Sequence, residues 1–410
     1  MIAACIPWWF GVLKTELASL FGQRGRPRQL ERLTATVLLL LFAMAAPVKA
    51  QEAWLVTYGP GEEVWEMFGH NALWLRDPET GLDHTYSFGY FEIDRAGFYV
   101  DFARGIMNYY GAASPADREF DFYRQRGRSV TAQKLALSAE QVQDLQKALH
   151  EAIYPHPQYY AYDYFRANCS TWLRDLINQV LDDALRTTLE GVMTDQSLAE
   201  HTRRMTRHRP WVQTGILALM GPSLDRRLTA WEESFLPEAL AHWVGSVGVD
   251  GQPLVVQQRT IHAGSPPHSV VQLSSLTPIP LITGLMLAAA MLALIRRGGV
   301  LAEWSWRFGA LTAGLVGAVL LAMMTLSGHH DTRWNLLVLL LHPLWWLLLV
   351  PRMRQRRRVL AIWIGVAAAS GSLILAWPGL LQDRLDLLPV VVPVLLVTLW
   401  GASRTASQPS

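Results

Sequence analysis

The sequence predicts an α+β domain outside the cytoplasm, followed by an all-α domain of five membrane-spanning helices. Residues 51–275 mix charged, aromatic and turn-forming residues as a soluble domain does, whereas residues 276–403 consist mostly of long apolar runs. Basic residues are unevenly distributed among the loops between those runs, which indicates how the chain is oriented in a membrane. The chain of 410 residues is completed by an N-terminal segment, 1–50, and a short tail, 404–410.

The N-terminal segment has the pattern of an export signal. An apolar run at residues 33–46 follows four arginines and leads into Val48 and Ala50. Small residues at these two positions suit cleavage before Gln51. We therefore expect a signal peptide that is removed, or a signal anchor that is retained in the membrane.

The five apolar segments predict the topology of the second domain. Arginines crowd the loops after the first and third segments, whereas Arg333 and Arg384 stand alone in the other two loops. Because arginine-rich loops stay in the cytoplasm, the soluble domain and the loop 328–333 are expected on the outer face, and the tail 404–410 on the inner face. The predicted segments are 278–295, 308–326, 334–350, 359–377 and 387–400.

Charge and cysteine content narrow the class of protein. The formal net charge is +2, and no basic stripe resembles a nucleic-acid groove reader, so nucleic acid is not an expected partner. The two cysteines are Cys5, in the N-terminal segment, and Cys169. An unpaired exported thiol is either buried in the core or used chemically.

The soluble domain is predicted to begin with strands and to continue with helices. Ser138-Ala139-Glu140-Gln141 is a capping box that opens a helix, and a later helix is expected at 223–244. Apolar residues recur at helical spacing from Cys169, which places this thiol in a first helical turn with Asn168 as N-cap. The predicted strands are 54–58, 70–75, 85–91 and 129–137.

Cys169 and His70 are the candidate nucleophile and base. The thiolate is the reactive form of cysteine, and a helix start with a neighbouring imidazole favours it. Backbone amides at that start, around Asn168 and Ser170, are expected to position the thiol and hold an oxyanion. The alternatives are a buried core cysteine and a hydrogen-bonded strand histidine.

Two motifs in a particular order resemble a known family. Phe68-Gly69-His70-Asn71-Ala72-Leu73 and Tyr86-Ser87-Phe88-Gly89 precede the segment Asp163-Tyr164-Phe165-Arg166-Ala167-Asn168-Cys169-Ser170-Thr171-Trp172-Leu173-Arg174-Asp175. This order resembles the Lnb family, typified by a lipoprotein intramolecular transacylase. The resemblance implies a circularly permuted papain-like (NlpC-type) domain, with histidine before cysteine as in lecithin retinol acyltransferase, and a five-helix membrane domain. It also implies a multi-pass protein of the bacterial inner membrane, with its catalytic domain in the periplasm.

The sequence departs from the family pattern beside the nucleophile. The family commonly has an acidic residue before the asparagine and a basic one three residues after the cysteine, where this chain has Ala167 and Trp172. The nucleophile itself is retained. These departures leave the exact acyl donor and acceptor open.

Several further residues are candidates for the site. A third polar residue usually orients the base, and His84 or Ser87 could supply it, although His84 fits a surface turn equally well. His329, His330 and Asp331 do not predict a metal, because adjacent histidines rarely converge on one ion without further ligands, and no cofactor is expected. The candidates for contact with substrate or headgroup are His329, His330, Asn335 and Arg174.

Three functions remain open from the sequence. The first is a membrane-bound thiol acyltransferase that forms a Cys169 thioester from a membrane lipid or a diacylated lipoprotein. The second is a cysteine hydrolase, either a cell-wall peptidase or a lipid esterase, that uses the same pair. The third is an envelope scaffold in which Cys169 is buried. Self-association is left open.

Overall fold

The computed structural model describes residues 51–156, 158–249, 251–264, 279–376, 382, 384 and 386–405. The expected signal segment and the expected linker from Ser265 to the membrane lie outside the described residues.

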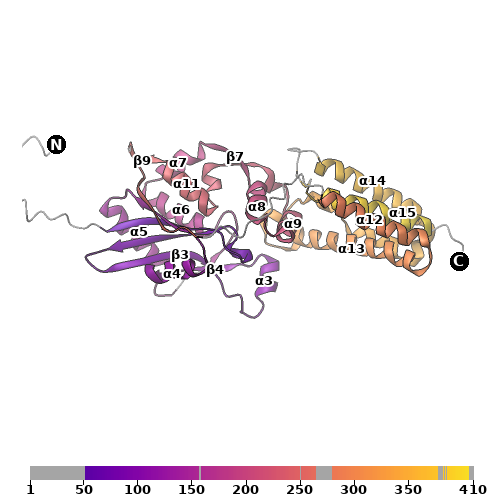
Figure 1. Ribbon diagram of the computed structural model, residues 1–410, viewed down its shortest axis with the longest axis horizontal. Coiled ribbons are helices and arrows are strands. Elements are labelled where there is room, and N and C mark those ends of the chain that lie inside the picture. The colour runs from indigo at the N-terminus through magenta and orange to yellow at the C-terminus, as the bar shows by residue number, and fades with distance from the viewer. Residues whose placement is uncertain are drawn as a thin grey trace, which may run out of the picture. The chain divides into compact units, whose positions relative to one another are not determined.

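A seven-stranded antiparallel sheet forms the centre of the soluble domain (Figure 1). Its strand order is β11-β5-β1-β2-β3-β4-β6, so the four predicted strands are confirmed as neighbours in the order β5-β1-β2-β3. Each starts within a few residues of its predicted position. The strands are β1 (Glu52–Tyr58), β2 (His70–Asp77), β3 (Leu82–Tyr90), β4 (Asn108–Pro115), β5 (Val130–Leu135), β6 (Tyr160–Ala161) and β11 (Val255–His262).

Both faces of the sheet are covered by helices. Alternate side chains of a strand point to opposite faces, so Leu73 and Leu75 of β2 face one layer and Trp74 faces the other. The first layer consists of α5 (Ala139–Ile153), α6 (Cys169–Val180) and α11 (Pro237–Ser246), and it packs around a large apolar core. The second is α4 (Ala116–Gln125), on the other side of the sheet in Figure 1.

Local signals explain where most of these helices begin. Ser138 accepts a hydrogen bond from the amide of Gln141 and forms the predicted capping box of α5.

The predicted single helix at 223–244 is wrong. That stretch holds a 3-10 turn, a strand and two short helices, because Thr229 caps a new helix and Pro237 starts another. The remaining elements of the domain are η1 (Val64–Glu66), α3 (Phe98–Arg104), α7 (Ala184–Glu190), β7 (Met193–Ser197), α8 (Leu198–Thr206), α9 (Pro210–Leu219), η2 (Pro222–Asp225), β8 (Arg227–Thr229), α10 (Ala230–Glu233), β9 (Gly248–Val249) and β10 (Gln252–Pro253).

The C-terminal region contains four described segments that are long and apolar enough to cross a membrane, and a shorter fifth helix. The third segment, His330–Leu349, is built from 3-10 turns rather than an α-helix, and Pro343 interrupts it. The second starts nine residues earlier than predicted, so Arg307 lies inside it. The elements are α12 (Ile279–Arg297), α13 (Gly299–Leu326), η3 (His330–Thr332), η4 (Leu336–Leu339), η5 (Pro343–Leu349), η6 (Pro351–Arg356), α14 (Arg357–Ala376) and α15 (Leu388–Thr405).

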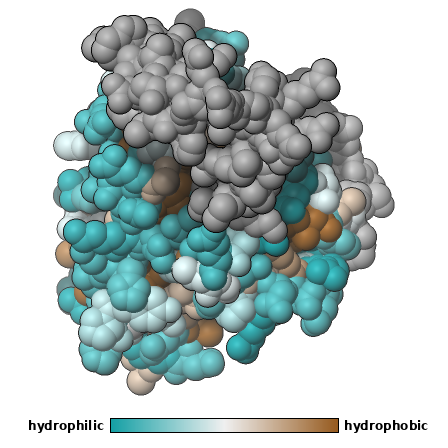
Figure 2. Space-filling model, turned by 90° about the vertical axis from the view of Figure 1, so that its left-hand side faces the viewer, coloured by the Kyte–Doolittle hydropathy of each residue, from teal (hydrophilic) through white to brown (hydrophobic). Residues whose placement is uncertain are grey.

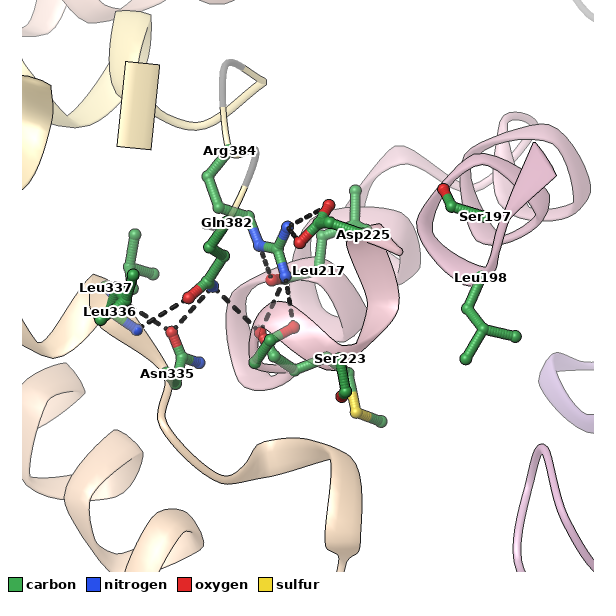
Figure 3. Close-up of polar contacts among 12 residues, drawn as sticks. Ser197, Leu198, Leu217, Ser223, Asp225, Asn335, Leu336, Leu337, Gln382 and Arg384 are labelled. Carbon is green, nitrogen blue, oxygen red and sulfur yellow. Dashed lines mark hydrogen bonds and ion pairs between the residues drawn. The ribbon is translucent and has the colours of Figure 1, made fainter. Parts of the chain in front are cut away.

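The loops predicted to lie outside the membrane contact the soluble domain. Arg384 is fully buried, forms an ion pair of 3.0 Å with Asp225, and donates to the carbonyl oxygen of Leu217 at 2.7 Å (Figure 3). Gln382 and Asn335 bond to each other at 3.0 Å in the same network. The amide of Gly221 donates to the Asp331 carbonyl oxygen at 2.6 Å, so both single-arginine loops meet the soluble domain, which agrees with the prediction that they lie on the same side of the membrane.

One face of the soluble domain can be seen in Figure 2. The face turned to the viewer in Figure 2 is mostly hydrophilic, with small scattered hydrophobic areas. A charged and polar surface of this kind suits an aqueous compartment.

Candidate functional site

Asn168 sets the start of the helix that carries Cys169. Its side-chain oxygen accepts from the amide of Thr171 at 2.9 Å, while its own amide donates to the Thr171 hydroxyl at 2.8 Å. Its Nδ2 donates at 2.9 Å to the carbonyl oxygens of Tyr164 and Phe235. The predicted N-cap is thus confirmed, and the same side chain ties the helix start to two other segments.

A hydrogen bond joins the helix to the sheet at the residues that follow the two candidates. Ser170, directly after Cys169, donates at 2.8 Å to the side-chain oxygen of Asn71, directly after His70. Asn71 is fully buried and also donates to the Thr57 hydroxyl at 2.9 Å. The start of α6 is therefore fixed against the start of β2.

The Cys169 thiol is half-buried and surrounded by amide donors. Burial raises its pKa, and hydrogen bonds from the backbone of Asn71 and from the side chain and backbone of Ser170 oppose that rise. The net direction is upward, opposite to the lowered pKa that the helix start predicts. Desolvation of the thiolate outweighs the helix terminus here, so the neutral thiol needs a base to activate it.

His70 begins β2 and lies beside a stacked pair of tyrosine rings. Its imidazole stacks against Tyr58, with 6.0 Å between ring centroids, and against Tyr123 at 6.3 Å. Burial, and secondarily the charge of Arg128, lower its pKa to about 3. At neutral pH the ring is uncharged and able to accept a proton. Within the described part of the chain, no hydrogen bond joins His70 to Cys169.

Arg128 is a residue of this site that the sequence does not reveal. Its side chain is 4% exposed; Nε donates to the Gly59 carbonyl oxygen at 2.7 Å, and Nη1 lies 3.3 Å from a carboxylate oxygen of Glu66. Its Nη2 is buried and has no hydrogen-bond partner among the described residues. The guanidinium charge acts on both His70 and Cys169. Arg128 lies in a turn before a strand, and nothing in the local sequence indicates that it lies near His70 and Cys169.

A buried carboxylate supports the ring beside His70. Glu119 of α4 accepts from Tyr58 at 2.8 Å, from Thr85 at 2.6 Å and from Ser87 at 3.1 Å. Burial raises the pKa of Glu119. Ser87, one of the two predicted orienting residues, is therefore committed to Glu119, and this cluster orients Tyr58, whose ring contacts the base.

His84, the other predicted orienting residue, lies far from the thiol. It pairs with Leu75, five residues along β2 from His70, which corresponds to about 17 Å of strand. Its Nδ1 is buried without a hydrogen-bond partner among the described residues. The structure does not bring His84 into the site, because strand spacing carries it to the opposite end of the sheet.

Tyrosines and a glycine surround the other side of Cys169. Gly89 has a positive φ of 102°, and a Cβ placed on it would lie 3.9 Å from the Cβ of Cys169 and 3.7 Å from the Tyr162 ring. The Tyr162 ring stacks on the Tyr109 ring, with 4.4 Å between their centroids. The space beside the thiol is thus narrow and mostly aromatic.

The predicted headgroup residues are used mainly by protein contacts. His329 donates through Nε2 to the Phe102 carbonyl oxygen at 2.7 Å, and Asn335 donates to that of Ala218 at 2.7 Å. Arg174 lies 3.8 Å above the ring of Trp231 and is 7% exposed. His330 alone of the four is exposed, so the structure does not gather them around Cys169.

The outer loop nevertheless reaches the segment before the nucleophile. Arg166, three residues before Cys169, binds both carboxylate oxygens of Asp331 at 2.7 and 2.9 Å. Ser223 donates to the same carboxylate at 2.8 Å. Among the described residues, no cluster of three or more histidine, cysteine or acidic side chains is placed to hold a metal ion.

Comparison with known families covers most of the chain. The profile of the Lnb N-terminal periplasmic domain matches residues 43–203, and that of the Lnb transmembrane domain matches residues 271–406. Neither the curated proteins nor the solved structures give a match. The two matches agree with a multi-pass membrane protein that has an extracytoplasmic domain. The chain therefore belongs to the Lnb-like family.

Proposed function

We propose that this protein is a thiol acyltransferase that acts on acyl esters of membrane lipids or lipoproteins. Cys169 is the nucleophile and His70 the general base. The observation that carries the proposal is the hydrogen bond between Ser170 and Asn71, because it holds the starts of α6 and β2 together, with amide donors around the sulfur. Acyl transfer requires the thiol to meet a neutral imidazole beside fixed amides, and this bond ties together the two segments that carry these groups.

The first half of the reaction forms a thioester. His70 takes the proton from Sγ as the sulfur attacks the ester carbonyl carbon, and the backbone amides of Asn71 and Ser170 stabilise the negative oxygen. The carbon–oxygen bond of the ester then breaks, and the leaving alcohol takes the proton from His70. The raised pKa of Cys169 and the lowered pKa of His70 mean that this proton moves during the attack rather than before it.

The second half passes the acyl group to an acceptor. An amine attacks the thioester carbonyl, His70 takes the amine proton, and the Cys169 thiolate leaves and is reprotonated. The family and the membrane region support a lipoprotein as the acceptor, with the α-amine of its N-terminal cysteine as the attacking group. Within this family, the acyl chain is expected to come from the lipoprotein's own glyceryl group.

Hydrolysis by the same pair is the second candidate. Water in place of the amine would release a fatty acid or a peptide, so the two functions differ in how well water is excluded. The stacked rings of Tyr162 and Tyr109 support transfer, because they fill space beside the thiol that an attacking water would otherwise occupy.

Intact-mass analysis tests the proposal. The purified protein is incubated with a diacylated lipopeptide, and both partners are weighed. We expect an acyl adduct on the wild type that Cys169→Ser and His70→Ala lack, together with an N-acylated peptide. His150→Ala, in an exposed histidine of α5, is the matched control and should behave as wild type. An unmodified lipopeptide and no adduct would overturn the acyltransferase, free fatty acid would favour the esterase, and resistance of Cys169 to thiol reagents would favour the scaffold.

A further inference from the structure

The helix α3 (Phe98–Arg104) exposes several large apolar side chains. It belongs to an excursion between β3 and β4, and none of its own residues is buried. Tyr99 is 72% exposed, Val100 62% and Phe102 38%, and Ile106 just after the helix is 42% exposed. Four large apolar residues within eight positions are unusual on a surface that meets only water.

The outer end of a membrane-spanning helix lies directly beside α3. The amide of Gly328 donates to the carbonyl oxygen of Arg104 at 2.7 Å, only two residues after the end of α13 at Leu326. A Cβ on Gly105 would lie 2.7 Å from the backbone of Gly328, so the two chains are in close contact. The membrane surface must therefore be near α3, since α13 leaves the bilayer there.

Two further exposed apolar residues lie near the outer end of α13. Leu326 is 81% exposed and Trp334, in the following outer loop, is 78% exposed. Tryptophan and tyrosine are enriched where membrane proteins meet the headgroup region. Arg104 of α3 is exposed and can reach a lipid phosphate while its neighbours lie deeper.

We propose that α3 is an interfacial helix whose exposed face, Tyr99, Val100, Phe102 and Ile106, lies in the outer leaflet of the membrane. The occupant of this face is lipid, because the face continues the surface of α13 at the point where that helix ends. Helices of this kind place their apolar residues about 5–10 Å into the boundary between headgroups and acyl chains.

A row of rings leads from this helix to the thiol. The ring centroids of Phe102 and Tyr164 are 6.4 Å apart, and those of Tyr164 and Tyr162 are 5.9 Å apart. Tyr162 in turn lies beside Gly89 and Cys169. If the proposed acyltransferase is correct, this row is the path along which an acyl chain leaves the leaflet for the sulfur. This step rests on the proposed function, whereas the location of α3 does not.

Spin labelling measures the location of α3 without any assay of activity. Single cysteines replace Tyr99 or Val100 in a full-length Cys5→Ser, Cys169→Ser background and carry a nitroxide in phosphatidylethanolamine–phosphatidylglycerol nanodiscs. We expect both labels to be several-fold more accessible to oxygen than to a water-soluble nickel chelate. A label at Arg118→Cys, exposed on α4, is the control and should show the opposite preference.

The alternative outcomes overturn the proposal. Labels at 99 and 100 that prefer the nickel chelate, like the control, would show that the face meets water. Strong dipolar broadening between labels at full labelling, lost on dilution with unlabelled protein, would show that a second copy of the chain covers it instead.

A charged variant then tests the path. Val100→Asp should reduce acyl transfer from bilayer-embedded donors several-fold, while Val100→Leu should not. Transfer from a water-soluble short-chain ester should be unchanged in both, because the chemistry at Cys169 is untouched. The labels could be accessible to oxygen while Val100→Asp transfers from both donors as fast as wild type. That result would overturn the path but not the location of α3. If the wild-type protein transfers no acyl group from either donor, the proposed function itself is wrong.

Discussion

Ser170 donates a hydrogen bond of 2.8 Å to Asn71, and these residues directly follow Cys169 and His70 in the chain. The bond crosses 99 positions of sequence and is completely buried at both ends. Any change in how α6 meets β2 must therefore alter the relation between the thiol and the imidazole.

Ser170→Ala removes the contact and leaves the Asn71 side-chain oxygen buried without its donor. We expect a loss of about 1–3 kcal/mol in the free energy of unfolding of the soluble domain. Acyl transfer should fall by more than this stability loss explains at temperatures where the variant is folded. Pulse proteolysis and the mass assay measure the two effects. Ser246→Ala, in an exposed serine that bonds to the Trp243 carbonyl oxygen, is the control and should change neither.

The raised pKa of Cys169 predicts how its reactivity depends on pH. Because burial favours the neutral thiol, alkylation by iodoacetamide should keep rising through pH 9 instead of levelling near neutrality. Mass spectrometry of the alkylated protein gives the rate at each pH. A plateau below pH 7 would show a preformed thiolate and would contradict the general-base mechanism.

His70 makes the stability of the domain depend on acid. Its folded-state pKa of about 3 lies below the unfolded value of about 6.5, so the unfolded chain binds the proton first as the pH falls. Stability is therefore unaffected above pH 6.5 and is lost between pH 6.5 and 3, by up to about 1.4 kcal/mol per pH unit. His70→Gln should shrink the loss between pH 6.5 and 4.5 in detergent-solubilised protein. Equal acid sensitivity in the two proteins would contradict the lowered pKa.

Gly89 tests how narrow the space beside the sulfur is. Its positive φ penalises any side chain by about 1–2 kcal/mol, and a methyl group here would also fill the space between Cys169 and Tyr162 at van der Waals distance from both. Gly81 is the matched control, since its φ of 76° carries a similar backbone cost with no atom within 4 Å of the added Cβ. Both alanine variants should lose similar stability in urea unfolding. Only Gly89→Ala should slow the alkylation of Cys169.

Features that depend on neighbouring residues could be predicted from the sequence. The caps at Ser138 and Asn168 join atoms three residues apart, so short motifs specify both helix starts and hence the place of Cys169. The central strands follow from alternating side chains and turn residues. The prediction of one helix at 223–244 is wrong because apolar residues recur across two helix starts, one capped by Thr229 and one at Pro237.

Features that depend on distant contacts could not be predicted. Arg128 reaches the site through Gly59 and Glu66, more than 60 positions away, and no local pattern records that approach. The direction of the Cys169 pKa shift likewise depends on burial, which the fold decides. His84 is a candidate because it lies on or just before the strand that follows His70, but the register of β2 and β3 places it away from the thiol.

Asp331 joins the outer loop to the segment before the nucleophile through Arg166. Asp331→Ala removes a carboxylate that is 6% exposed and binds Arg166 and Ser223, whereas Arg166 is half exposed and can turn to water. We expect a moderate stability loss of about 1–3 kcal/mol, faster amide exchange at 163–168, and slower acyl transfer. Asp195→Ala breaks an ion pair of equal length, 2.7 Å, in which both side chains are exposed, and should cost about 0–1 kcal/mol without changing transfer. Exchange at 163–168 that is the same in both variants would mean that the outer loop does not hold the segment before Cys169. Faster exchange together with unchanged transfer would mean that the loop holds this segment but that the chemistry does not depend on it.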